Sequence, residues 1–190
     1  MMFCRLSDYI LLHIQGAKYL AYNNFSQSNV KLPMDIERRD LMKNIRLRAL
    51  DLLALREHTR RELGTKLGRK FHDKDLIDEL LDELKAAGLQ SDKRYAEMFL
   101  RQRIRKGHGP KRIKVDLDSK GIDPELSNML LSSDGIDWRQ LVLTLLQRKC
   151  GEKRDLSKAD MARNGRFLAQ RGFSTEQIYQ AFRDYNNCGQ

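Results

Sequence analysis

The chain has 190 residues, and its 36 Lys and Arg against 26 Asp and Glu give a formal net charge of +10 at pH 7. Charged residues make up 33% of the chain and hydrophobic residues 41%, which excludes a disordered chain and favours a globular protein with a highly charged surface. The excess positive charge favours nucleic acid or an acidic protein surface as the partner, and an inert basic surface is the alternative.

Neither a membrane protein nor a zinc- or disulfide-stabilised protein is indicated. The mild apolar stretch Tyr9–Ile14 is too short to span a bilayer, and no small-residue cleavage site follows it. Cys4, Cys150 and Cys188 lie far apart and form no Cys-x-x-Cys pair. We therefore expect reduced cysteines in a cytoplasmic protein that has no membrane partner.

Residues 1–35 are predicted to be an N-terminal extension that is helical in part. The polar segment Asn23–Asn29, closed by Pro33, separates it from the rest of the chain. A start codon placed too far upstream, with Met34 or Met42 as the true start, is an alternative interpretation.

Residues 36–90 are predicted to form a first three-helix unit. Its first helix is expected to turn one apolar face inward, and Thr59–Glu62 has the Thr-x-x-Glu pattern of a capping box that opens the second helix. The third helix is predicted over 73–87, with Gly88 as its stop. The expected core residues are Leu47, Leu50, Leu53 and Ala54, then Leu63 and Leu67, then Leu76, Ile77, Leu80, Leu81 and Leu84.

Two more three-helix units are predicted over 91–134 and 135–190. In the first of these, Pro110 stands where a helix favours proline, in the first turn, directly after the break Gly107–Gly109. Trp138, near the start of the third unit, is expected to hold that unit against the second. No segment has the alternating pattern of a strand, so the predicted fold is all-α.

A weak internal repeat supports this division. Phe71, Ile122 and Phe173 are each 51 residues apart, and each follows a Leu and a cation near the end of a helix. These cations are Lys70, Lys120 and Arg171, and the residues suited to cap the next helix are Asp73, Asp123 and Ser174. A period of this size is typical of a small helical unit used in tandem. The predicted fold is therefore three tandem three-helix repeats that form an elongated, curved module, which suits binding better than catalysis.

The chain contains no recognisable catalytic, metal or cofactor site. Its four histidines lack ligand spacing and a neighbouring nucleophile, and no phosphate-binding glycine loop is present. The acidic set on the helix predicted over 73–87 lies on the arc opposite its leucines, as expected for a solvated helix face. We predict a protein that is not an enzyme, with no metal and no cofactor.

Basic residues gather between Ser91 and Ile122, where ten cations and four acids give a net charge of +6. Arg101 and Arg105 share one helical face, and Lys111 and Arg112 follow Pro110 in the first turn of a helix. Backbone amides left free in that turn are expected to add to an anion site. The pattern indicates a site for phosphates or for a partner's carboxylates, and a solvated surface is the alternative.

Several segments resemble the RecX family, the regulatory proteins that modulate the RecA recombinase. The resemblance covers about residues 45–185 and is densest in Asp92–Phe99 and Arg103–Ile113, the latter containing Lys-Gly-His-Gly-Pro-Lys-Arg-Ile. It continues through 117–122, 136–138 and 167–173. The first unit departs from the pattern, because Lys70-Phe71 lacks the glycine found at 121 and 172.

This resemblance implies a non-catalytic protein of tandem three-helix repeats. RecX proteins bind in the groove of the RecA filament on single-stranded DNA and inhibit its ATPase, strand-exchange and co-protease activities. A monomer acting in DNA recombination and repair is therefore expected. From charge clustering, the residues predicted to contact the filament or its DNA are Arg101, Arg103, Arg105, Lys106, Lys111, Arg112, Lys114, Lys120, Arg163 and Arg166.

Two other functions fit the same residues. Segments 60–84 and 110–130 both read as helix, turn, helix, which favours a stand-alone DNA-binding protein. A scaffold that recognises acidic helices without nucleic acid is the other alternative.

Overall fold

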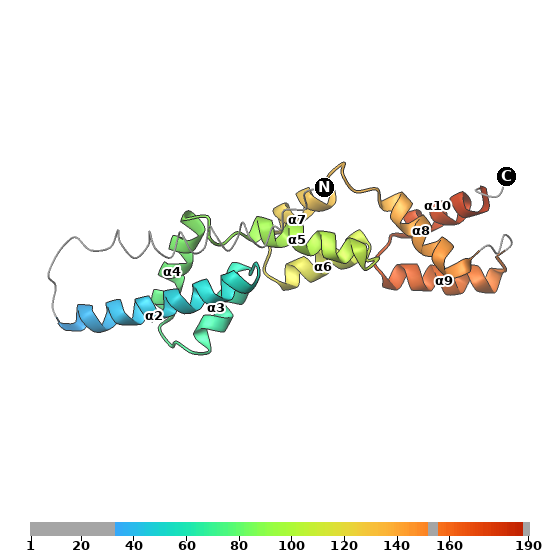
Figure 1. Cartoon of the computed structure of the whole chain (residues 1–190). Coiled ribbons are helices and arrows are strands. Elements are labelled where there is room, and N and C mark those ends of the chain that lie inside the picture. The colour runs from blue at the N-terminus through green and yellow to red at the C-terminus, as the bar shows by residue number, and fades with distance from the viewer. Residues whose placement is uncertain (1–32, 152–155, 188–190) are drawn as a thin grey trace, which may run out of the picture. The chain divides into compact units, whose positions relative to one another are not determined.

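The computed structural model describes residues 33–151 and 156–187, and all regular secondary structure in these ranges is α-helical (Figure 1). The all-α prediction is confirmed. None of the described helices is long and apolar enough to cross a membrane. The helices are α2 (Pro33–Leu55), α3 (Arg60–Gly68), α4 (Lys74–Ala86), α5 (Asp92–Arg105), α6 (Pro110–Ser119), α7 (Pro124–Leu131), α8 (Trp138–Cys150), α9 (Lys158–Gln170) and α10 (Thr175–Asn187).

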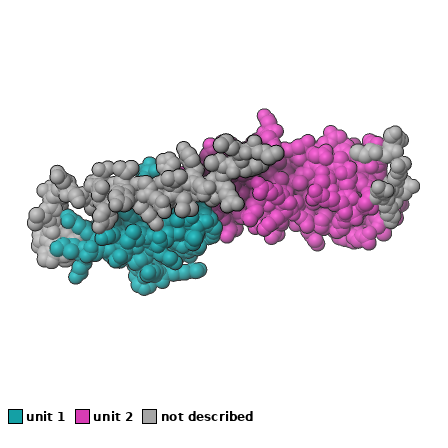
Figure 2. Space-filling view, viewed as in Figure 1, with its two compact units in different colours: residues 1–91 teal, residues 92–190 magenta. Residues whose placement is uncertain are grey.

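The described residues belong to two compact units that divide after Ser91 (Figure 2). The N-terminal extension predicted over 1–35 lies outside the described residues except for its last three, which open α2. Cys4 and Cys188 also lie outside them.

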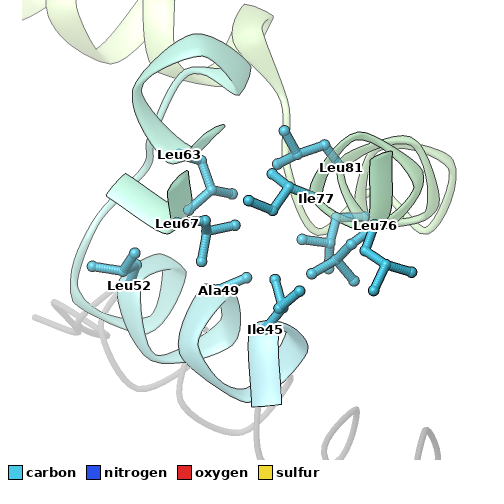
Figure 3. Close-up of a cluster of buried hydrophobic side chains, with 10 residues drawn as sticks. Ile45, Ala49, Leu52, Leu63, Leu67, Leu76, Ile77 and Leu81 are labelled. Atoms are coloured by element: carbon cyan, nitrogen blue, oxygen red, sulfur yellow. The ribbon is translucent and has the colours of Figure 1, made fainter. Parts of the chain in front are cut away.

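Helices α2, α3 and α4 enclose the core of the first unit. Apolar side chains from all three helices point toward one another, among them Ile45 and Ala49 of α2, Leu63 of α3 and Leu81 of α4 (Figure 3). Helices α3 and α4 begin where the sequence predicted. The Thr59 side chain accepts a hydrogen bond from the backbone N–H of Glu62, and the Asp73 side chain accepts one from the N–H of Leu76. After α4, Gly88 has a φ of 68°, a conformation that glycine adopts without strain.

The sequence predicted the wrong face of α2 to be buried in the core. Leu47 is 51% exposed and Ala54 is also exposed, whereas Ile45, Ala49 and Leu52 are buried. The helix carries two apolar stripes, and small Ala49 on the second stripe allows α3 and α4 to approach closely. Leu50 and Leu53 lie between the stripes and are half-buried.

A polar network joins the end of α2 to α3 around Glu62. Arg56 and Lys66 form ion pairs with this carboxylate, and the Nδ1 atom of buried His58 lies 3.2 Å from it. The backbone carbonyl of His58 accepts a hydrogen bond from the side-chain amide of Gln90. This bond ties the loop between α2 and α3 to the end of the unit. Burial raises the pKa of Glu62, but hydrogen bonds from Arg56 and His58 outweigh burial and lower its pKa to about 2.

We expect Glu62 to make the first unit sensitive to acid. Its folded pKa lies below its ordinary value of 4.5, so its contribution to stability is complete above pH 4.5 and is lost as the pH falls toward 2. The lowered pKa corresponds to roughly 3 kcal/mol of stability at neutral pH. Urea unfolding followed by circular dichroism from pH 7 to pH 3 should show a smaller loss in Glu62→Gln than in the parent. Glu37→Gln, on the exposed start of α2, is the control and should follow the parent.

The acidic side of α4 is exposed, as predicted, and it is also paired with neighbouring helices. Arg38 of α2 lies 3.0 Å from Glu79, and Arg60 of α3 lies 2.7 Å from Asp82. A third pair joins Arg46 of α2 to Glu83. These partly exposed pairs contribute little stability individually, but they neutralise the acidic helix within its own unit.

The second unit contains two further three-helix cores. Helices α5–α7 surround the first, which includes Phe99 and Ile113, and α8–α10 surround the second, which includes Leu146 and Phe173. Trp138 packs against both cores, and its Nε1–H donates to the Leu131 carbonyl at 3.2 Å. The prediction that Trp138 holds the third repeat against the second is confirmed.

The turn after the second helix differs between repeats as the missing glycine predicted. In the second and third repeats, Gly121 and Gly172 have φ values of 78° and 93°. In the first repeat, the N–H of Phe71 donates directly to the Leu67 carbonyl at 2.9 Å, and the turn is one residue shorter. In the second and third repeats the cations noted in the sequence, Lys120 and Arg171, are the C-cap residues of the second helix. In the first repeat the C-cap is Arg69, and the noted Lys70 follows it.

Candidate partner-binding surface

The turn between α5 and α6 is held by backbone hydrogen bonds to the third repeat. The N–H of Gly109 donates to the Arg171 carbonyl at 2.7 Å, and the N–H of Lys111 donates to the Gly172 carbonyl at 3.1 Å. We call the contact formed by Gly107, Gly109, Arg171 and Gly172 the glycine joint.

The glycine joint has no room for side chains. A Cβ added to Gly109 would lie 2.6 Å from the backbone carbon and oxygen of Gly172. A Cβ added to Gly172 would collide with the backbone nitrogen of Arg112. Contacts between real Cβ atoms and backbone are essentially never this short. Glycine is therefore required on both sides of the joint, because the two backbones touch there.

One of the backbone amides predicted to be free at the start of α6 is not available to an anion. Pro110 has no N–H, and the N–H of Lys111 is already bound by the Gly172 carbonyl. The acceptor comes from a residue 61 positions further along the chain, so no local pattern could reveal it. The first turn of α6 is bonded to the third repeat through the Lys111 amide, which is therefore not offered to an anion.

Arg171 closes the other side of the glycine joint. Its Nη1 donates to the Lys106 carbonyl at 2.6 Å and to the Gly107 carbonyl at 3.3 Å, which satisfies the end of α5. Its guanidinium also lies over the Phe167 ring, 4.7 Å from the centroid. In the sequence, Arg171 stands out only as a repeated cation near a helix end.

His108, inside the same turn, is half-buried. Burial lowers its pKa, and the nearby Arg103 and Arg171 lower it further. The imidazole is therefore neutral at pH 7 and adds no positive charge to this surface.

Half of the predicted contact residues are engaged in interactions, and four of these five hold carboxylates of the same unit. Arg103 and Arg112 both bind Asp116, at 3.2 and 3.4 Å, and Arg103 also lies over the Phe99 ring. Lys114 lies 3.7 Å from Asp118, and Arg163 lies 2.7 Å from Asp160. Lys120, the C-cap residue of α6, also makes an interaction.

The other predicted contact residues make no ion pair with any residue that the structure describes. All are exposed, and we call them the unpaired set: Arg101, Arg105, Lys106, Lys111 and Arg166. An unpaired cation keeps its full charge for an approaching anion, whereas a paired one must first release its carboxylate. The unpaired set is therefore the part of the predicted surface best suited to bind a negatively charged partner.

Family models match the chain in three consecutive stretches. Residues 46–84 match the model described as the first three-helix domain of RecX, residues 91–131 match the second, and residues 137–182 match the third. Together these stretches cover more than half of the chain.

Curated relatives decide the family. The regulatory protein RecX of Pseudomonas fluorescens is 37% identical over 139 residues, which is 73% of this chain and 90% of the relative. That of Acidithiobacillus ferrooxidans is 45% identical over 136 residues, covering 70% and 84%. The chain belongs to the RecX family. A crystal structure of RecX from Lactobacillus salivarius is also similar, with a TM-score of 0.70, 26% identity and coverage of 78% of this chain and 98% of that one.

The three RecX domains correspond to the three helical cores, so the predicted fold of tandem three-helix repeats is confirmed. Helix α2 begins at Pro33, well before the first RecX domain model starts at residue 46. The glycine joint links the second RecX domain to the third. Most of the predicted contact residues lie in the second domain, while Arg163 and Arg166 lie in the third.

Proposed function

We propose that this protein is a non-catalytic regulator that binds the RecA filament on single-stranded DNA. In this proposal it inhibits the filament's ATPase, strand-exchange and co-protease activities and so modulates DNA recombination and repair. It acts in the cytoplasm as a monomer, without a cofactor, and its repeats span residues 36–90, 91–134 and 135–190.

The observation that carries the proposal is membership of the RecX family, whose curated members are named regulatory proteins. The charge of the chain supports it independently. A net charge of +10 and an exposed unpaired set suit a partner that presents phosphates and carboxylates. In the proposal, the unpaired set makes the main contacts, and Arg103, Arg112, Lys114, Lys120 and Arg163 flank them.

The test is steady-state ATP hydrolysis by RecA on single-stranded DNA, titrated with this protein. We expect inhibition at well below one copy per recombinase. A second titration with excess single-stranded DNA separates filament binding from simple removal of DNA. Inhibition through the filament persists in excess DNA, whereas inhibition by sequestering DNA is relieved.

A stand-alone DNA-binding protein predicts a different result. Hydrolysis would not respond to the protein, although the protein would still bind bare DNA, with discrimination among duplex sequences if it reads base edges. That combination would contradict the proposed regulator function.

A further inference from the structure

The outward side of α3, in the first repeat, carries cations outside the predicted contact surface. Leu63 and Leu67 are fully buried, so the arc of α3 opposite them faces away from the core. At 100° per residue this arc contains Arg61 and Thr65, and Arg69 continues it because its backbone is still helical. All three side chains are exposed.

Nearby carboxylates are occupied by other partners. Glu62 binds Arg56 and Lys66, and the neighbouring Arg60 binds Asp82 of α4. Within the described part of the chain, neither Arg61 nor Arg69 makes an ion pair. Both guanidinium groups therefore keep their charge for a partner outside the unit.

The corresponding arcs of the other repeats are less positive. Arg61 stands two residues before the first buried leucine of α3, as Lys111 stands two residues before buried Ile113 in α6. Beyond Lys111, however, the arc of α6 continues with Val115, which is 63% exposed, and with Ser119. The corresponding residues of α9 are Ala162, Arg166 and Gln170, so each of these arcs carries one cation where that of α3 carries two. The arc of α3 contains no acidic or aromatic residue.

We infer that the arc of Arg61, Thr65 and Arg69 binds the sugar-phosphate backbone of single-stranded nucleic acid. The inference rests on the proposed function, which brings the protein to such a strand, and it adds a contact surface in the first repeat. The two arginines are eight positions apart along the helix, a rise of about 12 Å, which is enough to reach more than one phosphate. Gly68 lies between them, and an added Cβ there would meet nothing within 4 Å, so the strand can approach closely.

The chemistry favours the phosphates over the bases. Helix α3 has no aromatic side chain on which a base could stack, and its arginines suit bidentate contacts with phosphate. Binding through this arc should therefore depend steeply on salt and little on sequence.

The test measures binding of a fluorescent oligo-dT by the full chain at several salt concentrations, without RecA. Removing two phosphate contacts in Arg61→Ala/Arg69→Ala should reduce the slope of log K against log salt by about 1.4, since each contributes about 0.7 on single strands. Arg48→Ala/Lys85→Ala removes the same charge from exposed positions on α2 and α4, and it should keep the parent's slope. Circular dichroism verifies that both variants are folded.

A second pair of variants changes the charge of the arc without removing its arginines. Thr65→Asp places a carboxylate between the arginines and should weaken oligo-dT binding, while the neutral Thr65→Asn should not. If Arg61→Ala/Arg69→Ala binds with the parent's slope, the inference is wrong, although inhibition of RecA by the parent would still uphold the proposed function.

Two other outcomes also overturn the inference. If Arg61→Ala/Arg69→Ala bound oligo-dT as the parent does but bound DNA-free RecA more weakly, the arc would be assigned to a protein partner. Failure of the parent to bind oligo-dT and to inhibit RecA would overturn the inference together with the proposed function.

Discussion

Gly109→Ala is expected to destabilise the second unit by about 3–5 kcal/mol. The added methyl group would overlap the backbone of Gly172, which cannot rotate away as a side chain can. Relieving the overlap requires the turn of the third repeat to move, which breaks the hydrogen bonds from Gly109 and Lys111. Overpacking costs about 1–3 kcal/mol and each lost hydrogen bond about 1 kcal/mol.

The second unit contains two glycines that serve as controls. Gly135 has nothing within 4 Å of an added Cβ, so Gly135→Ala should leave the free energy of unfolding nearly unchanged. Gly151 also has free space but a φ of 64°, so Gly151→Ala should cost about 1–2 kcal/mol through its backbone conformation alone. Gly109 itself has a φ of −84°, which any residue can adopt, so its effect is steric.

Urea unfolding followed by circular dichroism measures all three variants. If Gly109→Ala were as stable as Gly135→Ala, the close contact between the two turns would be contradicted.

Reversing three members of the unpaired set should abolish inhibition of RecA. Arg101→Glu/Arg105→Glu/Lys111→Glu replaces cations that hold no carboxylate within the described chain, so the variant should stay folded while it repels an anionic partner. Phosphate and carboxylate contacts that attract the parent become like-charge contacts, which are unfavourable. Steady-state ATP hydrolysis by RecA on single-stranded DNA measures the loss.

The matched control carries the same change in net charge elsewhere on the unit. Lys93→Glu/Lys158→Glu/Arg183→Glu also lowers the net charge from +10 to +4, at exposed positions that hold no ion pair with described residues. We expect this control to inhibit RecA nearly as well as the parent, with some loss of association rate. Equal loss in both variants would show that overall charge, and not the unpaired set, directs binding.

Local patterns predicted most of the helical framework. The capping residues Thr59 and Asp73, the stop at Gly88 and the proline that opens α6 all depend on neighbours within a few residues in sequence. The period near fifty residues predicted three helical units for the same reason, since each unit repeats its own local signals.

The errors come from contacts between distant segments. Helix α2 carries two apolar stripes, and either could have formed its buried face. Packing against α3 and α4 selects the stripe that contains Ile45 and Ala49. At the start of α6, the amide of Lys111 is taken by Gly172, which lies in another repeat. Both outcomes depend on tertiary packing that a single helix cannot encode.

Charge clustering predicted a basic segment but not which cations are free. Arg103 and Arg112 were grouped with Arg101, yet they share Asp116. The i, i+4 spacing of Arg112 and Asp116 was visible in the sequence and could have indicated this pair. The pair between Arg103 and Asp116 joins two helices and could not be read from spacing.

The glycine joint has a consequence for how the second unit unfolds. The amides of Gly109 and Lys111 belong to one repeat but bond to carbonyls of the next, so they exchange with solvent only when that boundary opens. Trp138 spans the same boundary with its ring. We therefore expect the last two repeats to unfold together as one cooperative unit. In a chain cut between them, the amides of Gly109 and Lys111 would lose their acceptors and the carbonyls of Arg171 and Gly172 would lose their donors.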